Sequence, residues 1–344
     1  MNLLPARPGL VLSGLAVALL VIIVVSAGVG PVAVPVGTTA RILWAHLVPG
    51  EHIASWSLAQ DQIVWQFRLP RTLLAALVGA ALAVAGTVLQ AVIRNPLADP
   101  FVLGASSGAS LGAVAALAGG AVVPGLLVSG AAFSGAAIAA LLVFVLAQSG
   151  GRVESLRLVL AGVALSYLFS AATSWITVTA EHGKLPGLVF FLLGSVSTAT
   201  WEMLVIPAVV VLACVIHARV RVGPLNAVMT GDETATSLGV DVSRFRIEML
   251  IATSLLTGAV VAVSGGIGFV GMVVPHVCRL VVGADHRRLI PVATLAGAIF
   301  LVLVDIVART AAAPQELPIG IVTAAIGAPF FLWLLRRRPV GGVR

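Results

Sequence analysis

The sequence predicts an all-α integral membrane protein with about ten transmembrane helices in a single domain, residues 1–344. Hydrophobic residues make up 60% of the chain and charged residues 10%, against roughly 25% charged in soluble domains. The mean hydropathy is +1.13. Polar residues fall in short breaks between apolar runs of about 20 residues, the length that a helix needs to cross the hydrocarbon core. We therefore expect lipid to surround most of the chain.

Each apolar run is assigned to one span. The first run is longer than the roughly 7 to 15 apolar residues of a signal peptide, and no A-x-A pattern follows it, so we expect it to be the first span. The 36 glycines and the runs of alanine allow the close helix packing that membrane bundles need. The expected spans are 10–29, 70–93, 102–121, 124–149, 156–179, 200–219, 244–264, 267–284, 289–310 and 319–335.

Three stretches between the spans are not expected to cross. Residues 38–69 contain Arg41, Trp44, His46, Trp56 and Trp65, a composition typical of a helix lying at the outer interface. Residues 183–195 are apolar but too short to span, so a short outer helix is expected there. Residues 224–241 form the longest polar break. We expect them to make a cytoplasmic coupling segment that is exposed to a partner.

The basic residues predict the orientation. With both termini in the cytoplasm, 15 of the 20 basic residues fall on the inner side, as the positive-inside rule requires. These residues sit at the ends of segments and form no stripe with aromatic residues, so nucleic-acid binding is not expected. The five outer residues are Arg41, Arg68, Arg71, Lys184 and Arg309.

Two glycine motifs invite an enzymatic interpretation. Residues 104–108 match the G-x-S-x-G elbow of serine hydrolases, with His276 as a candidate second member. Small residues recur at the same spacing into Gly112, however, which favours close helix packing. Residues 266–271 spell G-x-G-x-x-G, but they lie between two spans with no strand before them. A tight hairpin between the seventh and eighth spans is the better interpretation.

The remaining reactive residues predict no catalytic or metal site. The six histidines form no close pair at ligand spacing, and the only cysteines, Cys214 and Cys278, each lie in an apolar run. Asp305 and Arg309 are four residues apart, the spacing of a helical ion pair. No G-x-x-x-x-G-K-[ST] motif is present, so we expect a separate subunit to use ATP and no covalently bound cofactor.

Three blocks of sequence, together covering residues 68 to 338, contain dense motifs. The first block contains Arg68-Leu69-Pro70-Arg71, Gln90, Arg94-Asn95-Pro96-Leu97-Ala98-Asp99-Pro100 and Gly104-Ala105-Ser106-Ser107-Gly108. The second contains Gly231-Asp232-Glu233-Thr234-Ala235 and Leu238-Gly239-Val240. The third contains Gly266-Ile267-Gly268-Phe269-Val270-Gly271, Val274-Pro275-His276, Asp305-Ile306-Val307-Ala308-Arg309 and Glu316-Leu317-Pro318-Ile319-Gly320. These blocks resemble the permease subunits of ATP-binding-cassette (ABC) importers for iron chelates and cobalamin.

The resemblance implies a type II ABC importer permease in a bacterial inner membrane. It implies a homodimer with a path along its twofold axis, two cytoplasmic ABC ATPase subunits and a periplasmic substrate-binding protein. It also implies three sets of functional residues. The residues implied for binding-protein docking are Arg68, Arg71 and Arg309. Those implied for the cytoplasmic gate are Asn95, Leu97, Ser155 and Leu156. Those implied for ATPase coupling are Leu225, Met229, Gly231, Asp232, Glu233, Leu238 and Gly239. Glu154 adjoins the gate where related cobalamin permeases carry a hydroxyl.

The substrate follows less directly. A path lined by small residues with few fixed charges suits a bulky apolar ligand, which leaves haem, a ferric siderophore and cobalamin open. Residues 190–195 and 336–338 resemble iron-chelate permeases more closely, so we expect an iron chelate, with cobalamin as the alternative. An ion-coupled secondary transporter is a further alternative. It would need an unpaired acid in mid-span, and only Asp305 qualifies.

Overall fold

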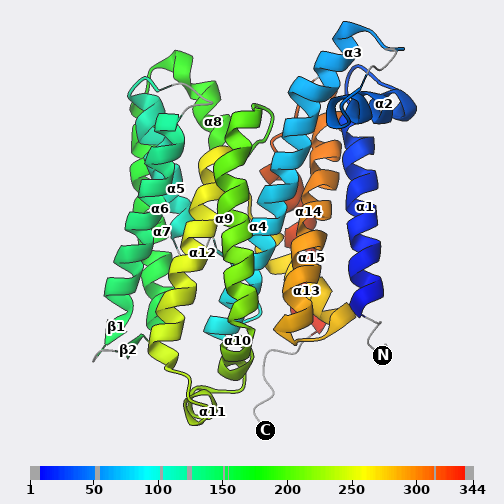
Figure 1. The fold of residues 1–344 in the computed structure, drawn as a ribbon. Coiled ribbons are helices and arrows are strands. Elements are labelled where there is room, and N and C mark those ends of the chain that lie inside the picture. The colour runs from blue at the N-terminus through cyan, green and yellow to red at the C-terminus, as the bar shows by residue number, and fades with distance from the viewer. Residues whose placement is uncertain are drawn as a thin grey trace.

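A computed structural model describes residues 8–50, 55–100, 104–121, 126–149, 152–153, 155–313 and 315–337. Within these ranges the chain is a bundle of roughly aligned helices (Figure 1). Seven helices are long and apolar enough to cross a membrane. They are α1 (Pro8–Gly28), α4 (Leu69–Ile93), α6 (Leu126–Ala147), α7 (Ser155–Thr179), α9 (Trp201–Val220), α12 (Val242–Ser264) and α14 (His286–Thr310).

Three further helices occupy the remaining expected spans, and the predicted all-α membrane fold is confirmed. They are α5 (Ala105–Ala118), α13 (Val270–Val282) and α15 (Ile319–Arg337). The expected span 267–284 is too long at its start, because residues 265–269 are not helical. Gly265 and Phe269 have positive φ angles of 67° and 69°, and a side chain at Gly265 would overlap the Phe191 carbonyl group. The bundle interior therefore contains irregular backbone beside the start of α13.

The elements between the spans lie at the two ends of the bundle (Figure 1). At one end are α2 (Val36–Leu47), α3 (Leu58–Gln62), the π-helical turn η1 (Ile63–Arg68), the 3₁₀ turn η2 (His182–Lys184) and α8 (Leu185–Leu193). At the other end are α10 (Val222–Met229), α11 (Asp232–Ser237) and a small antiparallel hairpin of β1 (Gln148–Ser149) and β2 (Arg152–Val153). The polar break 224–241 thus contains most of α10 and all of α11.

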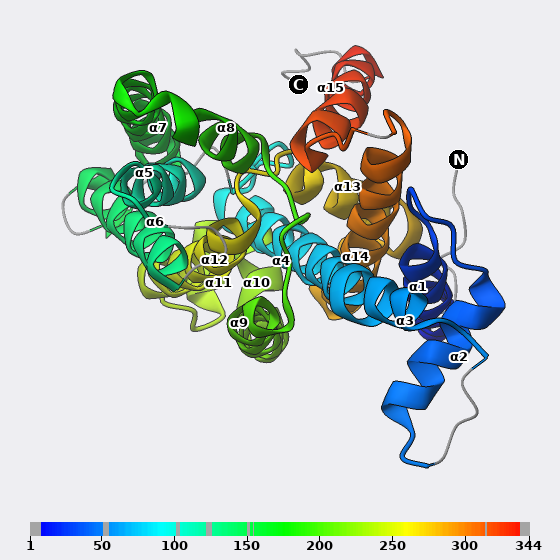
Figure 2. The ribbon, with the colours of Figure 1, turned by 90° about the horizontal axis from the view of Figure 1, so that it is seen from above.

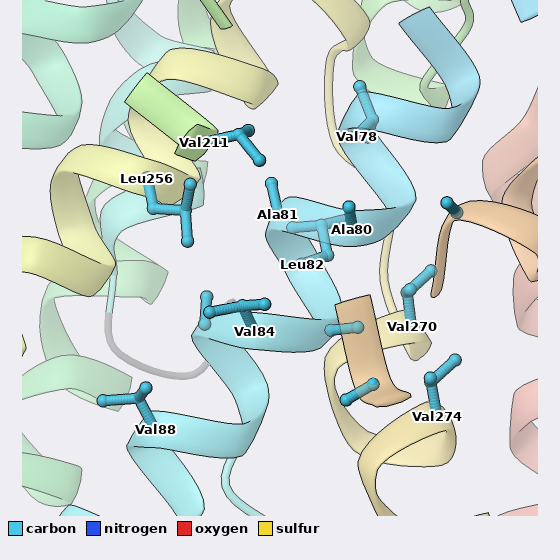
Figure 3. Packing of buried hydrophobic residues seen from close by; sticks show 14 of the residues in the cluster. Val78, Ala80, Ala81, Leu82, Val84, Val88, Val211, Leu256, Val270 and Val274 are labelled. Carbon is cyan, nitrogen blue, oxygen red and sulfur yellow. The ribbon is translucent and has the colours of Figure 1, made fainter. Parts of the chain in front are cut away.

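Helix α4 forms the centre of the bundle. Seen from above, it lies between α12 on one side and α13 and α14 on the other (Figure 2). Only Leu73 and Leu77 of its 25 residues are not buried, as expected for a helix that is apolar on all faces. Val211 of α9 and Leu256 of α12 lie on one side of it, and residues of α13 on the other (Figure 3).

Glycines set the closest helix contacts. A side chain at Gly79 would overlap the backbone of α14 at Gly297, and one at Gly108 would overlap the backbone of α6 at Gly135. Close packing of this kind supplies van der Waals contact where lipid removes the hydrophobic drive between helices. The packing interpretation of the G-x-S-x-G motif is therefore confirmed.

Candidate functional site

Three groups of residues singled out from the sequence occupy different parts of the bundle. The start of α1 and the end of α15 lie at the same end as α10, α11 and the hairpin (Figure 1). The loop after α4, where the gate was expected, is also at this end, whereas the three expected docking arginines lie toward the opposite end. The chain thus has the end-to-end separation that the positive-inside pattern predicts, and assignment of each end to a membrane side stays a prediction.

An ionic cluster joins α4, α14 and the segment before α15. Asp305 is fully buried. Arg71 donates through Nε to Asp305 Oδ1 at 2.9 Å and through Nη1 to both Glu316 oxygens, the nearer at 2.7 Å. Arg309 Nη2 lies 2.9 Å from Asp305 Oδ2, and this oxygen accepts no hydrogen bond within the described part of the chain. The helical Asp305–Arg309 pair predicted from spacing is confirmed.

Two of the three arginines also cap the end of α1. Arg68 donates through Nη1 to the Gly28 carbonyl oxygen at 2.8 Å and through Nη2 to the Val32 carbonyl oxygen. Arg309 donates to the Val29 carbonyl oxygen at 3.2 Å and to Ser26 Oγ at 2.6 Å. The last carbonyl groups of a helix lack partners within the helix and carry a partial negative charge, so guanidinium groups stabilise this end.

The burial of these arginines bears on the expected docking role. Arg68, Arg71 and Arg309 are 8%, 7% and 3% exposed, and all of them have partners inside the subunit. The group of this cluster that reaches solvent is Glu316, whose side chain is 33% exposed. Arg71 pairs with both Asp305 and Glu316, as expected if its role is structural instead of docking. Docking by these arginines therefore stays a prediction.

The expected gate loop follows α4 directly. Helix α4 ends at Ile93, and the next residue, Arg94, adopts a left-handed conformation with φ 56°. Asn95 Oδ1 then accepts a hydrogen bond from the Leu97 backbone N–H at 2.9 Å, an arrangement that favours a tight turn. Asn95 is exposed and Leu97 is half-buried. The other two expected gate residues, Ser155 and Leu156, are the first residues of α7. Their side chains and all of Glu154 lie outside the described residues.

A buried glutamine holds the gate loop against the bundle. Gln90 of α4 donates to the Gly271 carbonyl oxygen at 3.0 Å and to the Ala98 carbonyl oxygen at 3.3 Å, and its own oxygen accepts from Arg279 of α13. The sequence analysis quoted Gln90 within a motif and assigned it no role. The sequence did contain a signal for this role, because a lone amide side chain within a continuous apolar span needs hydrogen-bond partners.

The coupling segment presents two kinds of surface. Leu225 and Val228 of α10 are fully buried, so α10 is packed into the bundle. Met229 is 40% exposed and Leu238 is 67% exposed, which leaves apolar side chains free to contact a partner. Gly231 and Gly239, at φ 121° and 83°, flank α11 in conformations that favour glycine.

Polar contacts attach this segment to three other helices. Asn226 donates to Asp285 Oδ1 at 2.8 Å and accepts from the His286 backbone N–H at 3.1 Å, at the start of α14. Hydrogen bonds from the Arg287 backbone N–H and the Asn226 amide lower the pKa of Asp285. Asp232 of α11 accepts from Arg246 of α12 at 3.0 Å and pairs with Arg94 at 3.3 Å. Sequence reasoning identified Asp232 but none of these partners.

The described residues contain no group of three or more histidines, cysteines, aspartates or glutamates that could hold a metal ion. Asp305, the only acid that could have served a coupling ion in mid-span, instead faces Arg71 and Arg309. What the geometry offers is a packed bundle with an irregular, glycine-rich interior and a partly exposed segment at one end.

Known proteins are similar to this chain in sequence and fold. Residues 18–337 match the FecCD transport family. A cobalamin import system permease protein from Halobacterium salinarum is 46% identical over 81% of this chain and 74% of its own length. A hemin transport system permease protein from Yersinia pestis is 40% identical over 82% of this chain and 87% of its own. A solved structure described as a metal-chelate type ABC transporter in an inward-facing conformation has a TM-score of 0.83 and 35% identity, covering 95% of this chain and 99% of that one.

Proposed function

Because this chain belongs to the FecCD transport family and is an ABC importer permease, we propose that it carries an iron chelate, haem or a ferric siderophore, across a bacterial inner membrane. Similarity to the hemin permease and to the metal-chelate type transporter supports this cargo. Cobalamin is the alternative, since a cobalamin permease is also similar to the chain. The chain is not itself an enzyme in this proposal.

The coupling segment is the observation that carries the importer mechanism. The chain has no P-loop motif, so the energy of ATP must arrive through contact with another subunit. Met229 and Leu238 offer exposed apolar side chains beside the acidic start of α11. We assign this surface to a cytoplasmic ABC ATPase, with one ATPase for each permease subunit of a homodimer and with both chain termini in the cytoplasm.

The opposite end is assigned to a periplasmic substrate-binding protein. Arg68, taken together with the ionic cluster of Arg71, Arg309, Asp305 and Glu316, gives a net charge of +1 per subunit. A dimer would present two such clusters, and positive clusters would steer a partner with acidic lobes. Affinity for the binding protein should then fall as salt rises. Unchanged affinity in a folded Arg68→Gln variant would leave that arginine with the helix-capping role alone.

Transport in proteoliposomes tests the proposal. The permease, its ATPase and its binding protein are reconstituted, and uptake of haem, a ferric siderophore and cobalamin is measured with and without ATP. We expect ATP-dependent uptake of an iron chelate and weaker uptake of cobalamin. Uptake of cobalamin alone would favour the alternative cargo. Uptake driven by an ion gradient without ATP would overturn the importer mechanism in favour of a secondary transporter.

A further inference from the structure

One carboxylate in the coupling segment contacts two separate helices of the bundle. Asp232 Oδ1 lies 3.0 Å from Arg246 Nη2 and 3.3 Å from Arg94 Nη2. Asp232 is the first residue of α11, Arg246 belongs to the first turns of α12, and Arg94 directly follows the last residue of α4. A single oxygen thus links the surface assigned to the ATPase with α12 and with the end of α4.

The contact with Arg94 matters because Arg94 adjoins the expected gate loop. Arg94 directly precedes Asn95 and Leu97 of the expected gate loop, and its left-handed backbone marks the point where α4 stops. A force on its guanidinium group therefore acts on the residue that sets the direction of the gate loop. A further polar contact of the coupling segment, through Asn226, leads to the start of α14 and not to this loop.

The exposed fractions of the Arg246, Arg94 and Asp232 side chains allow the Arg94–Asp232 ion pair to break and form again. Arg246 is only 8% exposed and holds Asp232 from within the bundle, whereas the side chains of Arg94 and Asp232 are 41% and 42% exposed. A half-exposed ion pair contributes little to stability, because water solvates both charges when they separate. The Arg94–Asp232 contact can therefore break and form again without unfolding either helix.

We propose that the Asp232–Arg94 ion pair transmits displacement of the coupling segment to the gate loop, with Arg246 positioning Asp232 for this contact. The inference rests on the proposed function, since it needs an ATPase bound to the coupling segment. Both residues act by positioning and neither contacts the cargo. When the coupling segment shifts, Asp232 moves Arg94, and the turn at residues 95–97 changes its exposure to the cytoplasm.

Labelling of the gate loop tests this inference in the complex of the full chain with its ATPase. Cys214 and Cys278 are replaced by Ala, and Leu97→Cys provides one reporter. The rate of its reaction with a fluorescent maleimide is measured with and without a non-hydrolysable ATP analogue. Arg94→Gln removes the ion pair, and Arg244→Gln is the matched control. Arg244 is on the same end of α12 as Arg246 and has an 89% exposed side chain, and its ion pair within the described part of the chain is the local one with Asp241.

We expect the nucleotide to change the labelling rate in the unmodified background and in Arg244→Gln. In Arg94→Gln the two rates should be the same, while Arg94→Lys should restore part of the difference. Asp232→Asn should lose the response as well, and the Arg94→Gln, Asp232→Asn double variant should be no worse than either single variant. If Arg94→Gln fails to fold, Asp232→Asn carries the test.

Two failures can be told apart. If the unmodified chain neither retains the ATPase nor responds to nucleotide, the proposed function fails and this inference fails with it. If the ATPase is retained and Arg94→Gln responds to nucleotide as Arg244→Gln does, the inference is wrong and the proposed function stands. Additive losses in the double variant would also overturn it, because they would show that the two residues act separately.

Discussion

Replacing Asp305 by Asn should destabilise the protein strongly. Asp305 is fully buried, and its two oxygens lie 2.9 Å from Arg71 Nε and 2.9 Å from Arg309 Nη2. The Asn variant keeps the shape of the side chain but leaves Arg309 buried without a carboxylate partner and Arg71 with Glu316 alone. Removing one partner from a buried ion pair costs about 3–5 kcal/mol.

Glu316→Gln is the matched control, since it makes the same acid-to-amide change within the same cluster. Its side chain is 33% exposed, and the buried Arg71 keeps Asp305 as a carboxylate partner when Glu316 is replaced. Fully exposed pairs contribute about 0.2–1 kcal/mol, and this partly exposed pair, whose arginine keeps a second carboxylate, should cost less to break than the pairs of fully buried Asp305. The structure therefore predicts that the Asp305 variant loses several times more unfolding free energy than the Glu316 variant.

The assay is reversible unfolding of the purified chain by SDS in mixed micelles, followed by tryptophan fluorescence, with the unfolding free energy extrapolated to zero SDS. Equal free energies of unfolding for the two variants would refute the reasoning, because the cluster would then not stabilise the bundle. A second measurement is affinity for the binding protein. Loss of affinity in a fully stable Asp305 variant would favour docking as the main role of the neighbouring arginines.

Three further predictions concern packing, the gate and pH. Gly86→Ala should prevent close contact of α4 with α13 and lower the unfolding free energy by about 1–3 kcal/mol in the same assay. Gly130→Ala, with no atom near the new side chain, should not lower it. Equal losses of unfolding free energy in the two variants would contradict the close contact of α4 with α13. Cysteines at positions 97 and 155 should crosslink at a rate that depends on nucleotide, and identical rates would remove the gate assignment. The pKa of Asp285 is lowered in the folded chain, so its stabilising effect is present at neutral pH and lost as pH falls below about 4, through the lowered value. The unfolding free energy of the Asp285→Asn variant should therefore depend less on pH in that acidic range. An identical dependence would contradict a stabilising contact of Asp285 with Asn226 and the Arg287 backbone.

Much of the fold was predictable because the signals for membrane spans are local. A run of about 20 apolar residues must become a helix in lipid, since its backbone groups have no other partners there. The Asp305–Arg309 pair was predictable for the same reason, because residues four apart share a helix face. Small residues at four-residue spacing likewise indicated close helix packing at residues 104–112, and the structure shows that the partner of α5 there is α6.

The tertiary structure alone decided which distant groups meet. Arg68 was expected at an outer surface, yet the fold places it on the carbonyl groups at the end of α1, about 40 residues earlier. Arg71 meets Asp305 across 234 positions, and Gln90 meets Gly271 across 181. In a bundle whose helices are apolar on nearly every face, hydropathy does not specify which faces pack together. The partners of the few buried polar groups are therefore set by the packing of the whole bundle, which places each charge beside the group that can satisfy it.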